Sequence, residues 1–158
     1  NINFPSENGG GAESFGSTLH WGPVYNEDPF AKTHAVYSLP SGTLNDEFHT
    51  YGFYWDENQM YTYFDDDSTR VLQVNATDFW SLGEFPDSYF NPWSYSPNAN
   101  APFDTEFYLI MNVAVGGTSG YFPDGVGNKV WTNTDPHSVN SFYNNKAAWF
   151  ETWDAEKS

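Results

Sequence analysis

Short segments rich in aromatic and β-branched residues alternate along this chain with clusters of glycine, proline, asparagine and aspartate. This close spacing is typical of an all-β sandwich or barrel rather than of βαβ units. The strands that we predict are 15–21, 33–39, 47–55, 59–64, 70–75 and 107–115. Near the end of the sequence, apolar residues recur at helical spacing, which predicts a helix over 139–153. We therefore expect an all-β fold with one short C-terminal helix.

Three stretches of the chain refine this expectation. Residues 56–58 form a polar connection of hairpin length, so the strands on either side of it should pair antiparallel. Residues 107–115 form a nearly continuous apolar run, interrupted by Asn112, which predicts a central strand covered on both faces. The proline-rich stretch 83–103 also carries several aromatic residues, which favours an ordered loop packed over another part of the protein. The acidic run 65–67 resembles a hairpin turn.

The charge of the chain restricts its partners. Lys and Arg number 5 and Asp and Glu number 21, which gives a formal net charge of −16. So negative a protein repels phosphate backbones and anionic lipid headgroups, and we expect neither nucleic acid nor a membrane surface as its partner. An aromatic content of 20% excludes a disordered acidic tail. Because the chain has no Cys, disulfides, zinc–thiolate sites and Cys nucleophiles are excluded.

Acidic and histidine residues are the first candidates for chemistry. Asp104 and Glu106 have the i, i+2 spacing that puts two carboxylates on one face of a strand, and glycosidases use two carboxylates. Asp154 and Glu156 share this spacing. Such pairs arise by chance among 21 acidic residues, so a solvated strand entry is the favoured interpretation of the first pair. His20, His34, His49 and His137 lack metal-ligand spacing, and His20 would need a polar partner inside its predicted strand.

Aromatic residues in polar loops are the better candidates for ligand contact. Sugar rings pack their apolar faces on Trp and Tyr, whose edges remain polar. The loop aromatics with polar neighbours are Trp21, Trp93, Tyr121 and Trp131. The alternative for each is a place in the sandwich core. Asn75 opens an Asn-Ala-Thr glycosylation sequence, which is typical of a secreted, extracellular protein.

Four segments together resemble the laminarinase-type endo-β-1,3-glucanases of glycoside hydrolase family 16: 16–23 (GSTLHWGP), 47–55 (EFHTYGFYW), 102–117 (PFDTEFYLIMNVAVGG) and 120–125 (GYFPDG). Their order and spacing match the family over nearly the whole chain. The resemblance implies a concanavalin-like β-jelly-roll sandwich of two antiparallel sheets with a concave cleft. It also implies a neutral β-1,3-glucan as substrate and retaining hydrolysis by two Glu. It implies no required cofactor, although a structural Ca²⁺ is often found in this fold.

The sequence departs from the family at both ends. The family's Glu-x-Asp-x-x-Glu signature, which supplies the nucleophile and the acid/base, is absent, and Asn1 falls about where that signature would close. The family's last strand, which follows the C-terminal helix, is missing as well. We therefore expect residues 1–158 to form most of a single jelly-roll domain that is incomplete at both ends. Its missing strands, in another chain or fragment, would be a partner.

The resemblance assigns substrate-binding roles but no catalytic residue in this chain. It places His20 in the cleft beside the two absent Glu, and it makes Asn112, Trp131 and Trp93 further substrate-binding candidates. Asp104 and Glu106 are not the family's catalytic pair. Two functions follow: a secreted endo-β-1,3-glucanase to which this chain contributes cleft and subsites, or a β-1,3-glucan recognition protein without catalysis. A jelly-roll lectin of another family is a third interpretation.

Overall fold

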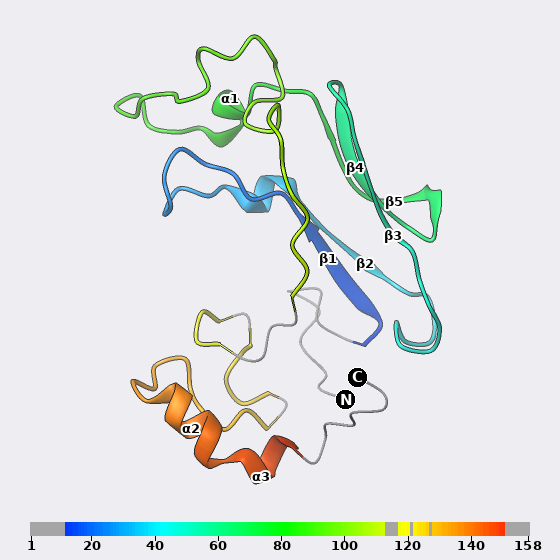
Figure 1. Cartoon of the computed structure of the whole chain (residues 1–158), viewed down its shortest axis with the longest axis vertical. Coiled ribbons are helices and arrows are strands. Elements are labelled where there is room, and N and C mark those ends of the chain that lie inside the picture. The colour runs from blue at the N-terminus through cyan, green and yellow to red at the C-terminus, as the bar shows by residue number, and fades with distance from the viewer. Residues whose placement is uncertain (1–11, 113–116, 121, 127, 151–158) are drawn as a thin grey trace. The chain divides into compact units, whose positions relative to one another are not determined.

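The computed structural model describes residues 12–112, 117–120, 122–126 and 128–150. The chain divides into two compact units (Figure 1). One, which we call the sheet unit, comprises Glu13–Ile110, and the other, the helical unit, comprises Asn1–Ala12 and Met111–Ser158. Each unit is described by itself below.

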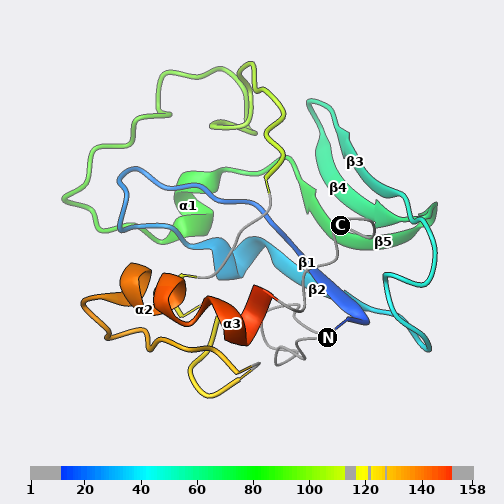
Figure 2. The ribbon, with the colours of Figure 1, turned by 60° about the horizontal axis from the view of Figure 1, so that its bottom comes forward.

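The sheet unit contains two antiparallel sheets. The first pairs β1 (Ser14–Thr18) with β2 (His34–Ser38). The second has the order β3-β4-β5 and consists of β3 (Tyr51–Trp55), β4 (Gln59–Phe64) and β5 (Asp66–Asn75), which form a curved sheet in Figure 2. The hairpin predicted across residues 56–58 is confirmed, with Trp55 opposite Met60. The fold is thus mainly β, built from two antiparallel sheets and a few short helices.

Aromatic rings from the two sheets meet between them. Phe15 of β1 and Tyr37 of β2 lie 5.5 Å and 4.8 Å from the ring of Phe64 in β4, measured between ring centroids. Tyr51 of β3 meets Phe15 edge-on at 4.8 Å. Burial of such large rings is the main favourable contribution to packing between the sheets.

A second apolar cluster lies at the other end of the strands. It consists of the buried residues Trp21, Met60, Phe79 and Phe103, with Phe85 and Trp93 among the half-buried residues packed against it. Phe79 belongs to the short helix α1 (Phe79–Gly83), which the sequence did not predict. The loop 83–103 contributes Phe85, Trp93 and Phe103 to this cluster, so the prediction of an ordered, packed loop is confirmed, and the structure shows that it packs on an apolar cluster.

The prediction of a central strand at 107–115 is wrong for residues 107–112. Those residues are in no strand, and residues 113–115 lie outside the described residues. The ring of Phe107 contacts Trp55 and Phe103, but Tyr108, Leu109 and Met111 are 84–86% exposed. A β-prone sequence forms a strand only where a neighbouring strand pairs with its backbone. Neither of the two described sheets provides that neighbour.

The helical unit contains two short helices where one was predicted. They are α2 (Ser138–Asn144) and α3 (Lys146–Trp149), and residues 151–153 lie outside the described residues. Asn145 separates them, and both its backbone N–H and its side-chain amide donate to the carbonyl of Ser141. The sheet unit also contains a one-turn 3-10 helix that the sequence did not predict, η2 (Phe30–Thr33). Among the described residues, no helix has the length and apolar character needed to cross a membrane.

Candidate functional site

The loop that joins β1 to β2 carries an exposed polar pair, His20 and Asp28. Asp28 Oδ2 lies 2.6 Å from His20 Nδ1, and Asp28 Oδ1 accepts a hydrogen bond from the backbone N–H of Trp21 at 3.2 Å. Because a carboxylate only accepts, Nδ1 must carry the proton, and in the neutral ring Nε2 is an acceptor. The His20 side chain is 68% exposed. The arrangement can therefore present a ring nitrogen of fixed tautomer to a ligand.

The sequence predicts that His20 lies in a strand, over 15–21, and this is wrong. Strand β1 ends at Thr18, and His20 lies in the loop that follows. The buried hydroxyl of Thr33 organises the turn instead, by accepting from the indole N–H of Trp21 at 2.9 Å and donating to the carbonyl of Leu19 at 3.0 Å. Gly22 allows the loop to close, since a Cβ at this position would lie 1.8 Å from the carbonyl oxygen of Glu27. The loop is thus held from inside, while His20 projects outward.

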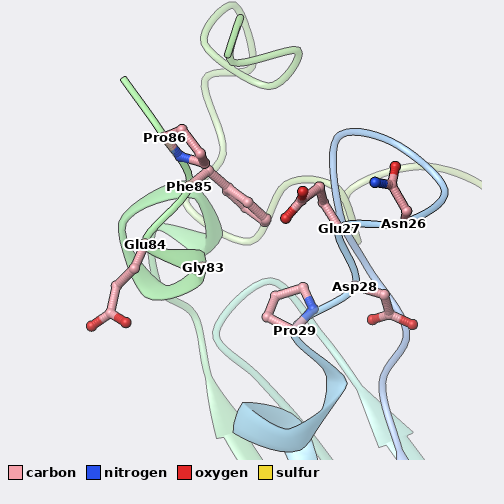
Figure 3. Close-up of a pocket in the computed structure, with 8 residues that line it drawn as sticks. All are labelled: Asn26, Glu27, Asp28, Pro29, Gly83, Glu84, Phe85 and Pro86. Carbon is pink, nitrogen blue, oxygen red and sulfur yellow. The ribbon is translucent and has the colours of Figure 1, made fainter. Parts of the chain in front are cut away.

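A pocket of about 180 Å³ adjoins this loop. It lies between two segments of the sheet unit and is lined by Asn26, Glu27, Asp28, Pro29, Gly83, Glu84, Phe85 and Pro86. In Figure 3, the carboxylate of Glu27 and the ring of Phe85 point toward one another across the opening, and Glu84 points away from it. One aromatic ring, two prolines and a carboxylate acceptor form the mixed surface on which a neutral sugar can pack and donate hydroxyl hydrogen bonds.

Hydrogen bonds from both sides fix the walls of the pocket. Tyr89 Oη donates to Glu27 Oε1 at 3.1 Å, and this bond to a carboxylate raises the pKa of Tyr89. On the opposite wall, Lys32 donates to the carbonyl of Leu82 at 2.8 Å and pairs with Glu84 at 2.7 Å. The hydrogen bond from Lys32 lowers the pKa of Glu84. Glu84 is therefore charged at neutral pH.

The remaining predicted binding residues lie in different surroundings. Trp21 is only 5% exposed and is a core residue rather than a surface for ligand contact. Trp93 is half-buried, and its ring lies 6.2 Å from that of Phe85, so it supports the ring that lines the pocket. Asn112 and Asn75 are exposed, the latter at the end of β5. Tyr121 lies outside the described residues.

Trp131 belongs to the helical unit. Its indole N–H donates to the carbonyl of Gly117 at 2.9 Å, and its ring meets Phe142 edge-on at 5.4 Å. The binding roles of Trp131, Asn112, Trp93 and His20 remain predictions, and so does glycosylation at Asn75.

The carboxylate of Asp104 has hydrogen-bond partners in the preceding loop. It accepts hydrogen bonds from the Ser96 hydroxyl and the Asn98 amide, and these lower its pKa. Glu106 is exposed. This arrangement fits the favoured sequence interpretation, a polar entry to the apolar segment, better than a catalytic pair. Asp154 and Glu156 lie outside the described residues.

The other histidines pair locally. His34 lies 2.7 Å from the hydroxyl of Thr18, and His49 lies 2.9 Å from the carboxylate of Asp65. Within the described part of the chain, no three His, Cys, Asp or Glu side chains are grouped so that they could hold a metal ion.

Sequence reasoning did not find Asp28, Glu27 or Phe85. Asp28 is eight residues from His20, a separation that corresponds to no regular element, and only the closed loop brings the two side chains together. Phe85 belongs to the aromatic-rich stretch 83–103, but residue spacing does not reveal which segment lies across the pocket from it.

The sequence of the chain is similar to proteins whose names refer to β-1,3-glucan. No family model and no solved structure matches it. It is 43% identical over 143 residues to the beta-1,3-glucan-binding protein of Penaeus monodon, covering 89% of this chain and 38% of that protein. It is 32% identical over 154 residues to the protein of the same name in Tenebrio molitor, covering 91% of this chain and 30% of that protein. These relatives are beta-1,3-glucan-binding proteins.

A bacterial enzyme is also among the relatives. The chain is 32% identical over 105 residues to the glucan endo-1,3-beta-glucosidase A1 of Niallia circulans, covering 66% of this chain and 13% of the enzyme. The similarity to the two glucan-binding proteins covers more of the chain. The chain spans only 38% and 30% of the lengths of those two proteins.

Proposed function

We propose that this chain recognises β-1,3-glucan and does not itself hydrolyse it. The observation that carries the proposal is the similarity to beta-1,3-glucan-binding proteins, which extends over 89% and 91% of the chain at 43% and 32% identity. The finer assignment, a laminarinase-type jelly-roll domain, is part of the same proposal. Its support is the set of four sequence segments together with the two antiparallel sheets.

The geometry of the sheet unit suits a neutral polysaccharide. Glu27 at the pocket and Nε2 of His20 beside it can accept hydrogen bonds from sugar hydroxyls, while the ring of Phe85 provides an apolar face. A net charge of −16 does not oppose an uncharged ligand, whereas it would repel a polyanion. The pocket and His20 are therefore the proposed contact region of this unit.

Hydrolysis is the second candidate, and the observation that favours it is the similarity to the Niallia circulans endoglucosidase. In that case the two catalytic carboxylates would come from outside these 158 residues, which contain no Glu-x-Asp-x-x-Glu sequence. The chain would then contribute subsites to a complete enzyme.

Two further proposals concern the whole protein. The exposed apolar segment 107–112 would complete a sheet by pairing with strands outside this sequence, which agrees with a domain that is incomplete at both ends. An extracellular location fits the exposed acceptor at Asn75.

The test is retention of the purified chain on insoluble polysaccharide. We expect the chain to sediment with an insoluble β-1,3-glucan and to remain in solution with cellulose, a β-1,4-glucan. His20→Ala should reduce retention, because it removes the exposed acceptor. His137→Ala is the matched control, since His137 is an exposed histidine of the helical unit.

Released reducing ends distinguish the two candidate functions. We expect none from laminarin incubated with the chain. Equal sedimentation with both polysaccharides, or with neither, contradicts glucan recognition. Sedimentation with steady release of reducing ends contradicts the non-catalytic assignment.

A further inference from the structure

Lys129 is a buried cation at the centre of the loop that carries Trp131. Its side chain is 4% exposed. Its ammonium donates to the carbonyl of Phe122 at 2.8 Å, to Asp124 Oδ1 at 2.8 Å and to Asn133 Oδ1 at 2.5 Å. An ammonium has three donors, and here each has an oxygen acceptor. Burial of a charge is tolerated only when it is paired and fully hydrogen-bonded, so this ammonium is a fixed point in the loop.

Asp124 completes this arrangement. Besides Lys129, it accepts the backbone N–H of Asn133, at 3.0 Å to Oδ1 and 3.1 Å to Oδ2. The hydrogen bond from Lys129, followed by that from Asn133, lowers the pKa of Asp124. The carboxylate of Asp124 thus stays charged at neutral pH, and it joins Lys129 and Asn133, which flank Trp131 on both sides.

The ammonium also contacts the tryptophan directly. Lys129 Nζ lies 5.4 Å from the centre of the Trp131 ring, which is within cation–π range. The indole N–H is held by the carbonyl of Gly117, and Phe142 meets the ring edge-on. Three different contacts therefore set the orientation of one half-buried indole.

We propose that Lys129 is a positioning residue that sets the orientation of the Trp131 indole, and that Trp131 presents this oriented ring to a neutral sugar. The inference rests on the proposed glucan recognition for its ligand. A stacking ring contributes most when it is held in its bound orientation before the ligand arrives, because less ordering is then lost on binding. Lys129 would provide that order without touching the glucan.

The first experiment follows the ring without any ligand. The purified chain is labelled with fluorotryptophan, and the Trp131 resonance is assigned from its loss in Trp131→Phe. We expect Lys129→Met to shift or broaden this resonance. Lys146→Met is the matched control, because Lys146 is an exposed lysine of the same unit whose ammonium lies 4.3 Å from the centre of a different ring, Phe150. An unchanged Trp131 resonance in folded Lys129→Met overturns the inference.

The second experiment measures laminarin affinity in a double-mutant cycle. We expect Lys129→Met to weaken binding about fivefold, comparable to one oriented aromatic contact, and Lys146→Met to leave it unchanged. In a chain that already carries Trp131→Ala, Lys129→Met should weaken binding less than about twofold. The effect of Lys129 requires the Trp131 ring, which this background lacks. An equal loss in both backgrounds shows that Lys129 supports the fold alone and overturns the inference.

Two outcomes separate this inference from the function on which it rests. If the wild-type chain does not bind laminarin, glucan recognition fails, and the sugar-binding half of the inference fails with it. The fluorine resonance still decides the positioning half. If Lys129→Met does not fold, as far-ultraviolet circular dichroism would show, Asn133→Ala replaces it. That variant removes one of three acceptors, keeps the ion pair with Asp124 and should change the resonance and the affinity in the same direction.

Discussion

Replacing Asp28 by Asn should reverse the hydrogen-bonding role of His20. In the native loop, the two carboxylate oxygens accept from His20 Nδ1 at 2.6 Å and from the Trp21 N–H at 3.2 Å. The introduced amide has only one oxygen. If that oxygen keeps the Trp21 N–H, the amide NH₂ faces Nδ1 and requires it to accept. The proton then moves to Nε2, which becomes a donor where the native ring offers an acceptor.

The size of the effect follows from the exposure of the pair. The side chains of His20 and Asp28 are 68% and 32% exposed, so solvent screens their interaction strongly. A hydrogen bond contributes about 0.5–1.5 kcal/mol; because Asp28→Asn exchanges a bond to a carboxylate for a bond to a neutral amide, we place the loss of unfolding free energy at about 0.5 kcal/mol, the lower end. The affinity for glucan should fall by about three- to tenfold, because the change lies in the proposed contact region. In free energy this is a larger effect than the loss of stability.

Nitrogen NMR of the histidine rings and titration with laminarin together test this reasoning. We expect the His20 shifts of Asp28→Asn to indicate the Nε2-protonated tautomer, with reduced affinity. Asp46→Asn is the matched control, since it removes one charge from an exposed turn in which Asp46 accepts from the backbone N–H and the hydroxyl of Thr43. If Asp28→Asn keeps both the native tautomer and the native affinity, the assigned role of Asp28 is refuted.

Two further predictions concern the stability of the sheet unit. A Cβ at Gly52 would lie 1.9 Å from the Tyr63 ring, so Gly52→Val should lower the free energy of unfolding by about 1–3 kcal/mol in urea titrations, and adding Tyr63→Ala should restore part of it. No restoration by the second substitution would refute the overpacking mechanism. Asp78 accepts from Ser81 and Trp80 at the start of α1, and chiefly the Ser81 hydroxyl lowers its pKa from 3.8. Its stabilising effect should be present above pH 3.8 and be lost as the pH falls through the lower folded value. Urea midpoints are measured as the pH is lowered from about 5. They should fall less for Asp78→Asn than for the native chain, because the amide of Asn caps a helix at any pH. Parallel curves for the two proteins would contradict this.

The hairpin was predictable because its signals are local. Strand β4 begins and ends as predicted, at Gln59 and Phe64, since a polar connection of three residues fixes where the chain reverses. The next turn was placed less well. Within the predicted acidic turn 65–67, only Asp65 turns, with φ 59°, and β5 already begins at Asp66.

Other elements depend on contacts that spacing does not reveal. Helix α1 could have been predicted, because Asp78 and Ser81 have the spacing of an N-terminal cap. The apolar run at 107–112 could not have been placed correctly from its sequence, since a strand there requires pairing with another strand. The predicted need of His20 for a polar partner rests on a place inside a strand, which is wrong, and its partner Asp28 is identified only by the path of the loop.

Calorimetric titration of the chain with short, soluble β-1,3-glucan oligosaccharides, at low and at high salt, tests the central claim most directly. A neutral ligand releases no counterions, so we predict saturable binding with nearly the same affinity at both salt concentrations. No heat of binding in a folded chain, or an affinity that collapses as salt rises, would contradict recognition of a neutral β-1,3-glucan by these residues.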